Sequence, residues 1–194
     1  MSISLVAGLG NPGPEYRHTR HNAGWMLVDA CAKKHGLSWR TSSKFNAKIA
    51  RWDRAPSGAC WLMKPTTFMN ESGCSVRALA KFYRIPSPAI VVLCDDLTIE
   101  FGRIKITKAG GAGGHNGVAS LLRELAVGFI RYRIGIGPKY PREANLTDFV
   151  LGQFNRQEQA LFAQKLESYV NGLELLLHSG VDAAMNQLNR KNPP

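Results

Sequence analysis

The chain has 194 residues, of which 44% are hydrophobic and 20% charged. This composition is typical of a folded globular protein with one sizeable core, not of a disordered or fibrous chain. A net charge of +11 favours a polyanionic partner such as nucleic acid. We find no apolar run long enough for a membrane span and no signal-peptide pattern, so we expect a cytoplasmic protein without a membrane partner.

The loop from Gly8 to Gly24, with the sequence GLGNPGPEYRHTRHNAG, is the most informative stretch. An apolar segment before it predicts a buried strand, and a helix is predicted to begin near Asn22. Between them the loop carries Asn11 and His21 without any regular apolar period. A polar loop of this length on a rigid scaffold is typical of a binding or catalytic site.

Strands and helices are predicted to alternate along the rest of the chain. Strands are expected over residues 44–52, 59–64, 89–94, 103–108 and 130–137, and helices over 22–35, 71–83, 118–125, 156–177 and 181–188, with Asn70 as a helix N-cap and 139–155 as a polar connection. The pattern predicts a single-domain α/β fold over residues 1–190, with a twisted, mixed, largely parallel sheet covered by helices on both faces. Residues 191–194 are expected to form a flexible tail.

The four cysteines lie in stretches with an apolar period and form no C-x-x-C pair. They are Cys31, Cys60, Cys74 and Cys94. This pattern predicts buried free thiols in a reducing compartment.

A dinucleotide site must be considered, because Gly8–Gly13 matches G-x-G-x-x-G after a strand. That motif presents backbone N–H groups and a helix N-terminus to a pyrophosphate. Pro12 and Pro14 lack N–H groups, and the helix starts only near Asn22. The acidic residue that follows, Asp29, falls inside the predicted helix. A nicotinamide or flavin cofactor is therefore disfavoured.

A metal site is a second alternative. His18 and His21 form an H-x-x-H pair, and His115 and nearby carboxylates offer further ligands for zinc or manganese. The flanking cations Arg17 and Arg20 oppose a divalent ion, and a loop has no helical face to align the two imidazoles. We therefore expect no metal.

Nucleophilic catalysis has little support in the sequence. There is no G-x-S-x-G elbow and no G-K-[ST] after the glycine-rich stretch. Cys94 stands beside Asp95, but its place in an apolar strand favours a buried core thiol over a nucleophile.

A metal-free general-base site remains. His21 can take a proton from water near neutral pH, and Asp95, at the end of the strand over residues 89–94, can fix its tautomer. Asn11, Asn70 and Asn116 offer amide donors and acceptors for a carbonyl, a water or an oxyanion. Each of these asparagines, taken singly, is more typical of a cap or turn residue, but the three together with His21 and Asp95 favour a functional site. Ligands gather at the carboxyl ends of strands in such sheets, so we expect these groups to meet there with the loop over 110–117.

Six motifs occur in one order along nearly the whole chain. They are GLGNPGPEYRHTRHNAG, KPTTFMNESG, Asp95 after a hydrophobic strand, GGAGGHNG, RYRIGIG and FVLGQF. Together they closely resemble the bacterial-type peptidyl-tRNA hydrolase family. The resemblance implies an enzyme, expected here as a monomer without a cofactor, that hydrolyses the ester between a peptide and the 3′ ribose of tRNA and so recycles tRNA in translation.

The resemblance also implies a role for each matching residue. His21 would be the catalytic base and Asp95 its orienting carboxylate. Asn11 and Asn70 would contact substrate at the ester, and Asn116 would position the water or stabilise the oxyanion. The expected substrate-binding residues are Tyr16, Phe68, Met69 and His115, and the expected contacts to tRNA phosphates are Lys105, Lys108, Arg131 and Arg133.

The chain departs from the family pattern in two places. Ala109 and Ala112 replace a Gly and a His of the glycine-rich stretch, and Thr107 stands where Lys is common. The acidic segment reads D-D-L-T, with Thr98 in place of a common Asp. These changes put the phosphate contacts in doubt but leave the His–Asp–Asn set intact. The alternative is an inactive RNA-binding relative with the same fold.

Overall fold

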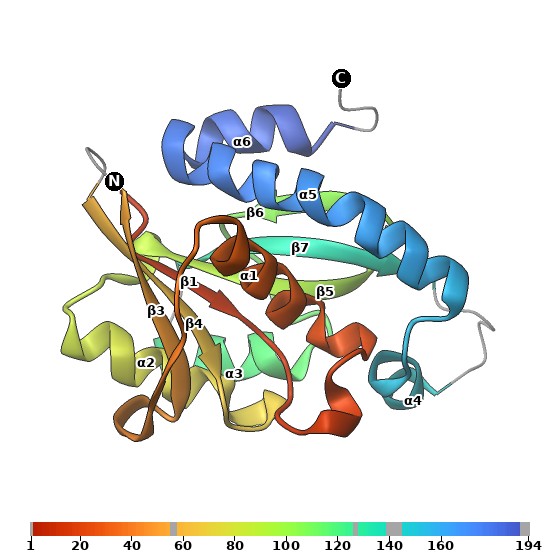
Figure 1. The fold of residues 1–194 in the computed structure, drawn as a ribbon, viewed down its shortest axis with the longest axis horizontal. Coiled ribbons are helices and arrows are strands. Elements are labelled where there is room, and N and C mark those ends of the chain that lie inside the picture. The colour runs from red at the N-terminus through yellow and green to blue at the C-terminus, as the bar shows by residue number, and fades with distance from the viewer. Residues whose placement is uncertain (1, 55–57, 126–127, 139–144, 191–194) are drawn as a thin grey trace.

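The structure, a computed structural model, describes residues 2–54, 58–125, 128–138 and 145–190. It contains one seven-stranded sheet in the order β2-β3-β4-β1-β5-β7-β6 (Figure 1). The strands are β1 (Leu5–Gly8), β2 (Arg40–Ser42), β3 (Ala47–Arg54), β4 (Gly58–Pro65), β5 (Ile90–Glu100), β6 (Ile104–Thr107) and β7 (Ile130–Gly137). The four central strands are parallel and antiparallel strands flank them at both edges, which confirms the predicted mixed α/β sheet.

Alternate side chains of the central strands enter two separate cores, as the period of two in a strand requires. The helices are α1 (Ala23–Lys34), α2 (Ser72–Phe82), α3 (Asn116–Leu125), α4 (Leu146–Leu151), α5 (Arg156–Ser179) and α6 (Val181–Leu188). Val6 and Val91 pack with α1, α5 and α6, whereas Leu5 and Val92 pack with α2 and α3 (Figure 1). Burial on both faces explains the continuous apolar run that begins β5.

The glycines around the first loop allow α1 to lie against the strands. A Cβ atom on Gly24 would come within 2.3 Å of the carbonyl oxygen of Leu93, and one on Gly8 within 2.5 Å of that of Gly24. Only a residue without a side chain fits at these contacts. Helix–strand packing therefore accounts for these two glycines of the loop without a bound pyrophosphate.

Several predicted boundaries were wrong. Lys44 does not open a strand but lies in the 3₁₀ turn η3 (Ser43–Phe45), because Asn46 takes a left-handed conformation with φ 46° before β3 begins. Asn70 is not an N-cap but the middle of the 3₁₀ turn η4 (Met69–Glu71), and α2 starts after it. The short strand β2 was not predicted.

The region after Cys94 also differs from the prediction. β5 does not end before Asp95 but continues to Glu100, because it keeps pairing with β7. The polar connection contains the helix α4, whose N-cap Asn145 accepts bonds from the first-turn N–H groups. Residues 139–144 and the predicted tail at 191–194 lie outside the described residues.

Three of the four cysteines are buried, as predicted, but Cys74 is exposed. It lies on the solvent side of α2, whose other face buries Val76 and Leu79. No helix within the described ranges is both long and apolar enough to cross a membrane.

Candidate active site

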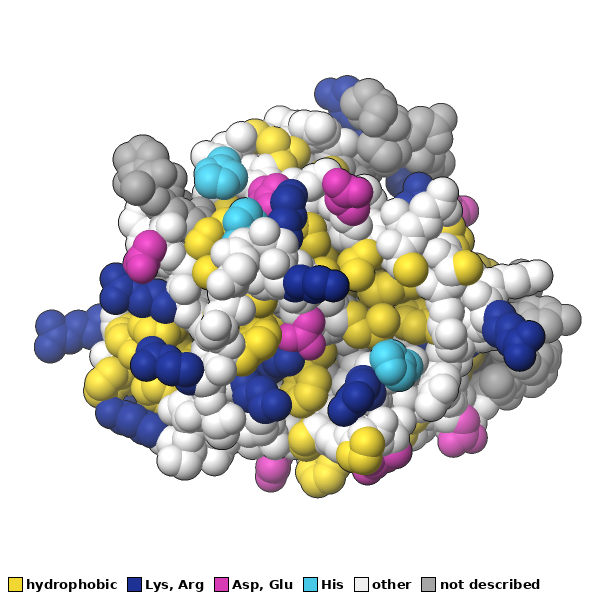
Figure 2. Space-filling model, in the orientation of Figure 1, with side chains coloured by type: hydrophobic (Ala, Val, Ile, Leu, Met, Phe, Trp, Pro, Cys, Tyr) yellow, Lys and Arg dark blue, Asp and Glu magenta, His cyan; other side chains and the backbone are white. Residues whose placement is uncertain are grey.

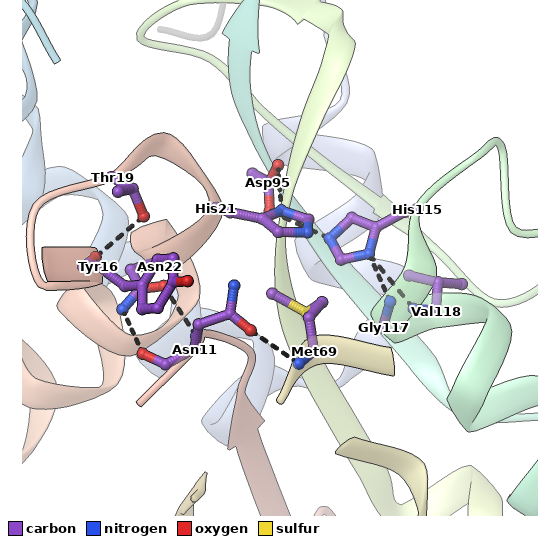
Figure 3. Close-up of polar contacts among 10 residues, drawn as sticks. All are labelled: Asn11, Tyr16, Thr19, His21, Asn22, Met69, Asp95, His115, Gly117 and Val118. Atoms are coloured by element: carbon purple, nitrogen blue, oxygen red, sulfur yellow. Dashed lines mark hydrogen bonds and ion pairs between the residues drawn. The ribbon is translucent and has the colours of Figure 1, made fainter. Parts of the chain in front are cut away.

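His21 and Asp95 form a buried, hydrogen-bonded pair (Figure 3). His21 lies in the 3₁₀ turn η2 (Arg20–Asn22), just before α1, and Asp95 lies in β5. Nδ1 of His21 is 2.9 Å from Oδ1 and 3.1 Å from Oδ2 of Asp95. A carboxylate only accepts hydrogen bonds, so the proton of the neutral imidazole is on Nδ1. Nε2 of His21 is thereby left as a proton acceptor.

Asp95 is held in its ionised form by the two histidines that face it. Burial alone would raise the pKa of its carboxyl group, but the positive charge that His115 and His21 carry when protonated, together with their hydrogen bonds, outweighs burial and holds that pKa well below its usual range. The carboxylate can therefore stabilise an imidazolium without itself taking the proton.

His115 is the second histidine on this carboxylate. Its Nε2 is 3.0 Å from Oδ1 of Asp95, and the centre of its ring is 4.7 Å from that of the His21 ring (Figure 3). Its Nδ1 accepts backbone N–H bonds from Gly117 at 3.1 Å and Val118 at 3.3 Å. The proton of His115 is therefore on Nε2. Both ring nitrogens are occupied, so this ring is suited to hold the loop and Asp95 and not to act as a second base.

The same three residues are the only described group with the spacing of a metal site, with ligand atoms within 4.8 Å of one another. A metal on Nε2 of His115 would need the ring proton on Nδ1, where it would face the N–H groups of Gly117 and Val118. The hydrogen bonds thus favour protons over a metal at this site. Arg20 does not oppose an ion at this site, contrary to the prediction, because its guanidinium is directed at Glu158 and the carbonyl of Phe149.

Arg20 connects the first loop (Gly8–Gly24) to the helices α4 and α5, which follow β7. Its guanidinium lies 2.6 Å from Glu158 of α5, donates to the carbonyl of Phe149 at 3.2 Å and stacks over the Phe149 ring. This contact joins the RHTRHN and FVLGQF motifs in the folded chain. His18, by contrast, is exposed, so the H-x-x-H pair does not converge.

Asn11 joins the first loop to the segment before α2. Its Oδ1 accepts the N–H of Met69 at 2.8 Å, and the side-chain nitrogen points towards the part of the site where His21 lies (Figure 3). Asn22 holds the Asn11 backbone at both ends, through bonds of 2.8 and 3.0 Å. The sequence indicated Asn22 only as a helix start. Its position beside His21 in the RHN motif was the one signal for this role.

The other predicted substrate residues surround this buried centre less closely. Asn70, Asn116 and Phe68 are exposed, and Tyr16 is half-buried in the first loop. Met69 is buried. Asn70 follows Met69, and its carbonyl accepts a bond from Arg123 at 3.3 Å. Asn116 is the first residue of α3, next to His115. Each of these two asparagines thus reaches the buried centre through its sequence neighbour, Met69 for Asn70 and His115 for Asn116.

The four side chains predicted to contact phosphate differ in exposure and in whether another group already binds them. Arg131 is buried, and its guanidinium donates to the carbonyls of Gly110 and Gly111. Arg133 is paired with Asp96 at 2.7 Å, and Lys108 with the exposed Asp182. Lys105 is exposed, and no ion pair joins it to a carboxylate within the described residues. The structure thus gives Arg131 a role in holding the glycine loop.

Three of the departures from the family pattern, Thr107, Ala109 and Ala112, line a cavity of about 230 Å³ between this loop and β7. Thr107 lines it, and its buried hydroxyl has no partner among the described residues. Thr98 donates to Asp96 and accepts from Arg133 at 3.3 Å, and so supports that ion pair. Ala112 packs against the core below α3.

Comparisons with known proteins identify the family and the fold. A family model described as peptidyl-tRNA hydrolase matches residues 5–194. A peptidyl-tRNA hydrolase of Gloeobacter violaceus is 42% identical over 99% of this chain and 96% of its own length. One from Symbiobacterium thermophilum is 46% identical over 95% and 98%. The crystal structure of the Acinetobacter baumannii peptidyl-tRNA hydrolase superposes with a TM-score of 0.90 at 38% identity, covering 99% and 97% of the two chains.

Proposed function

The chain belongs to the peptidyl-tRNA hydrolase family, and on that premise we propose that it hydrolyses the ester between the peptide and the 3′ ribose of tRNA, with His21 as the general base. The observation that carries the mechanism is the Nδ1 contact of His21 to Asp95 at 2.9 Å, which leaves Nε2 to take a proton. Neither a metal nor a cofactor is needed, because an ester is already an activated substrate.

The proposed reaction uses one bound water. Nε2 of His21 takes a proton as the water oxygen attacks the ester carbonyl carbon, and Asp95 stabilises the imidazolium. Amide donors, with Asn11 and Asn116 as candidates, stabilise the oxyanion. The bond to the 3′ oxygen then breaks and His21 returns the proton to it. The products are the free peptide acid and tRNA.

The basic residues are proposed to hold the tRNA. Lys105 is the candidate best placed for phosphate contact, since it is exposed on β6, with Arg133 on the neighbouring strand and Lys108 at the start of the glycine loop. Such contacts would position the acceptor end without reading its sequence. Asn70, Phe68 and Tyr16 are proposed to contact the ester-linked end. The expected state is a monomer in the cytoplasm, where peptidyl-tRNA is formed.

The test is release of the blocked amino acid from N-acetyl-aminoacyl-tRNA by the purified protein with EDTA present. We expect turnover under these conditions. Salt-sensitive tRNA binding without any turnover would contradict the proposal and support the alternative, an RNA-binding relative. Turnover that EDTA abolishes would contradict the metal-free mechanism.

A further inference from the structure

A cavity of about 710 Å³ lies on the face covered by α1, beside the first loop (Gly8–Gly24) and separate from the cavity at the glycine loop. Apolar side chains of α1 and α5 line it, among them Trp25, Met26 and Leu166, and residues 12–14 form one edge. Figure 2 shows apolar surface in the middle of this face with Lys and Arg side chains around it. Its volume is in the range of sites for small organic ligands.

The charges around this cavity favour an anion. Arg17, Lys33, Lys48 and Lys64 line it, against the single carboxylate of Asp29. Lys64 already pairs with Asp29, with 2.5 Å between Nζ and Oδ1. Within the described part of the chain, no ion pair joins the other three cations to a carboxylate. The cavity therefore has uncompensated positive charge over an apolar floor.

Trp25 gives this floor a fixed aromatic surface. Its ring packs on Gly10, where an added Cβ would lie 2.6 Å from the ring. The ammonium of Lys64 lies 5.5 Å from the Trp25 ring centre and 4.7 Å from that of Trp39. The indole N–H of Trp25 is buried and has no partner among the described residues, although buried indoles usually find one.

We propose that this cavity binds an organic phosphate with a flat apolar body, of the size of a nucleoside monophosphate. The flat ring would pack on the floor with Trp25, and the phosphate would lie near Lys33, Lys48 and Arg17. Such a group has two sources, a free nucleotide and an unpaired nucleotide of an RNA strand. Binding at this cavity does not require hydrolysis, so it can be tested independently of the proposed function.

The first experiment titrates AMP, adenosine and inorganic phosphate into the full-length protein and follows heat and tryptophan emission. We expect AMP to bind more tightly than either of its parts. Lys33→Gln and Lys48→Gln should each weaken AMP binding by roughly three- to tenfold. The matched control is Lys81→Gln, because Lys81 occupies the last turn of α2 as Lys33 does that of α1. It should leave binding unchanged.

Three results would overturn the site. They are no saturable AMP binding at millimolar concentration, adenosine binding as tightly as AMP, and equal effects of Lys33→Gln and Lys81→Gln. Trp25→Phe provides a second check, since it should remove most of the AMP-dependent emission change. An emission change that survives in Trp25→Phe would place the ligand elsewhere and contradict the proposal.

Competition separates the two sources of the ligand. Binding of uncharged tRNA is measured with the wild-type protein, since this RNA carries no ester to hydrolyse. If a nucleotide of the RNA occupies the cavity, AMP will displace tRNA competitively and Lys33→Gln will weaken tRNA binding. If the ligand is a free nucleotide, AMP and tRNA will bind together. Either result supports the site, and each identifies a different source of its ligand.

Discussion

Both carboxylate oxygens of Asp95 face Nδ1 of His21, at 2.9 and 3.1 Å, and the histidine can therefore present only Nε2 to a substrate. The pair joins two strands that are far apart in the sequence but adjacent in the sheet, β1 through its loop and β5 directly. The proton arrangement is thus built into the fold before substrate binds, which is the condition for efficient general-base catalysis.

Replacing Asp95 by Asn should lower kcat by roughly 10²–10⁴-fold. The amide cannot stabilise the imidazolium, and its NH₂ group would oppose the N–H groups of His21 and His115 that now face the carboxylate. Steady-state hydrolysis of N-acetyl-aminoacyl-tRNA measures the effect, with circular dichroism as the check on folding. A folded Asp95→Asn protein with more than a tenth of the wild-type kcat would contradict this role.

His115→Asn should have a smaller effect, a fall in kcat of about tenfold. The Asn side-chain oxygen can still accept the N–H groups of Gly117 and Val118, but the bond to Asp95 is lost. The pH dependence of kcat/KM should keep the wild-type shape, since His21 remains the base. Loss of the acidic limb in His115→Asn would show instead that His115 takes part in the proton transfer.

Acid should destabilise the protein through Asp95. Its folded-state pKa is held below that of an unfolded Asp, about 3.9, by His115 and His21 despite burial. The unfolded state therefore binds more protons between the two values, and stability present above pH 4 is lost as the pH falls. Urea unfolding at pH 5, 4 and 3 measures this for wild type and Asp95→Asn. The stability difference between the two should change over this range, and a constant difference would refute the assignment.

Gly117→Ala should destabilise the fold by about 1–3 kcal/mol. An added Cβ would lie 2.5 Å from Sδ of Met69 and 2.9 Å from Cδ1 of Leu9. The N–H of Met69 is bound by Asn11, and that of Gly117 by His115, so a shift here would disturb both site residues. Gly111→Ala is the matched control, because nothing lies within 4 Å of its Cβ position. Urea unfolding of both variants measures the difference. Equal stabilities would mean that the site does not need this close contact.

Lys105→Ala should weaken tRNA binding and lower the slope of log K against log salt by about one. Lys105 is exposed and has no carboxylate partner among the described residues. Arg131→Ala should act differently and impair hydrolysis more than the salt slope, because Arg131 holds the glycine-loop carbonyls. Binding isotherms at several salt concentrations distinguish the two. An unchanged slope in Lys105→Ala would remove it from the phosphate contacts.

Much of the fold followed from local pattern. The continuous apolar run of β5 and the helical period of α5 are strong signals, and both elements begin at or next to the predicted residue. The predictions failed for two different reasons. β5 extends through Asp95 because β7, distant in the sequence, pairs beside it, whereas the turn at Lys44 is a local feature that depends on the left-handed Asn46.

The candidate site was also predicted only in part. The motifs pointed to Asn11, His21 and Asp95, which do lie on neighbouring strands and loops. Sequence spacing could not reveal that His115 shares the carboxylate, that Arg131 holds the glycine loop, or that Asn22 holds Asn11. These contacts depend on side-chain directions that only the packed structure defines.

The central claim is that His21 is the base, and single-turnover hydrolysis with saturating protein tests it most directly, because weakened binding then has no effect. We predict that His21→Ala lowers this rate by roughly 10²–10⁴-fold. The matched control, His18→Ala, removes an exposed histidine of the same loop and should leave the rate unchanged. A folded His21→Ala protein with a rate within about tenfold of wild type would contradict the account.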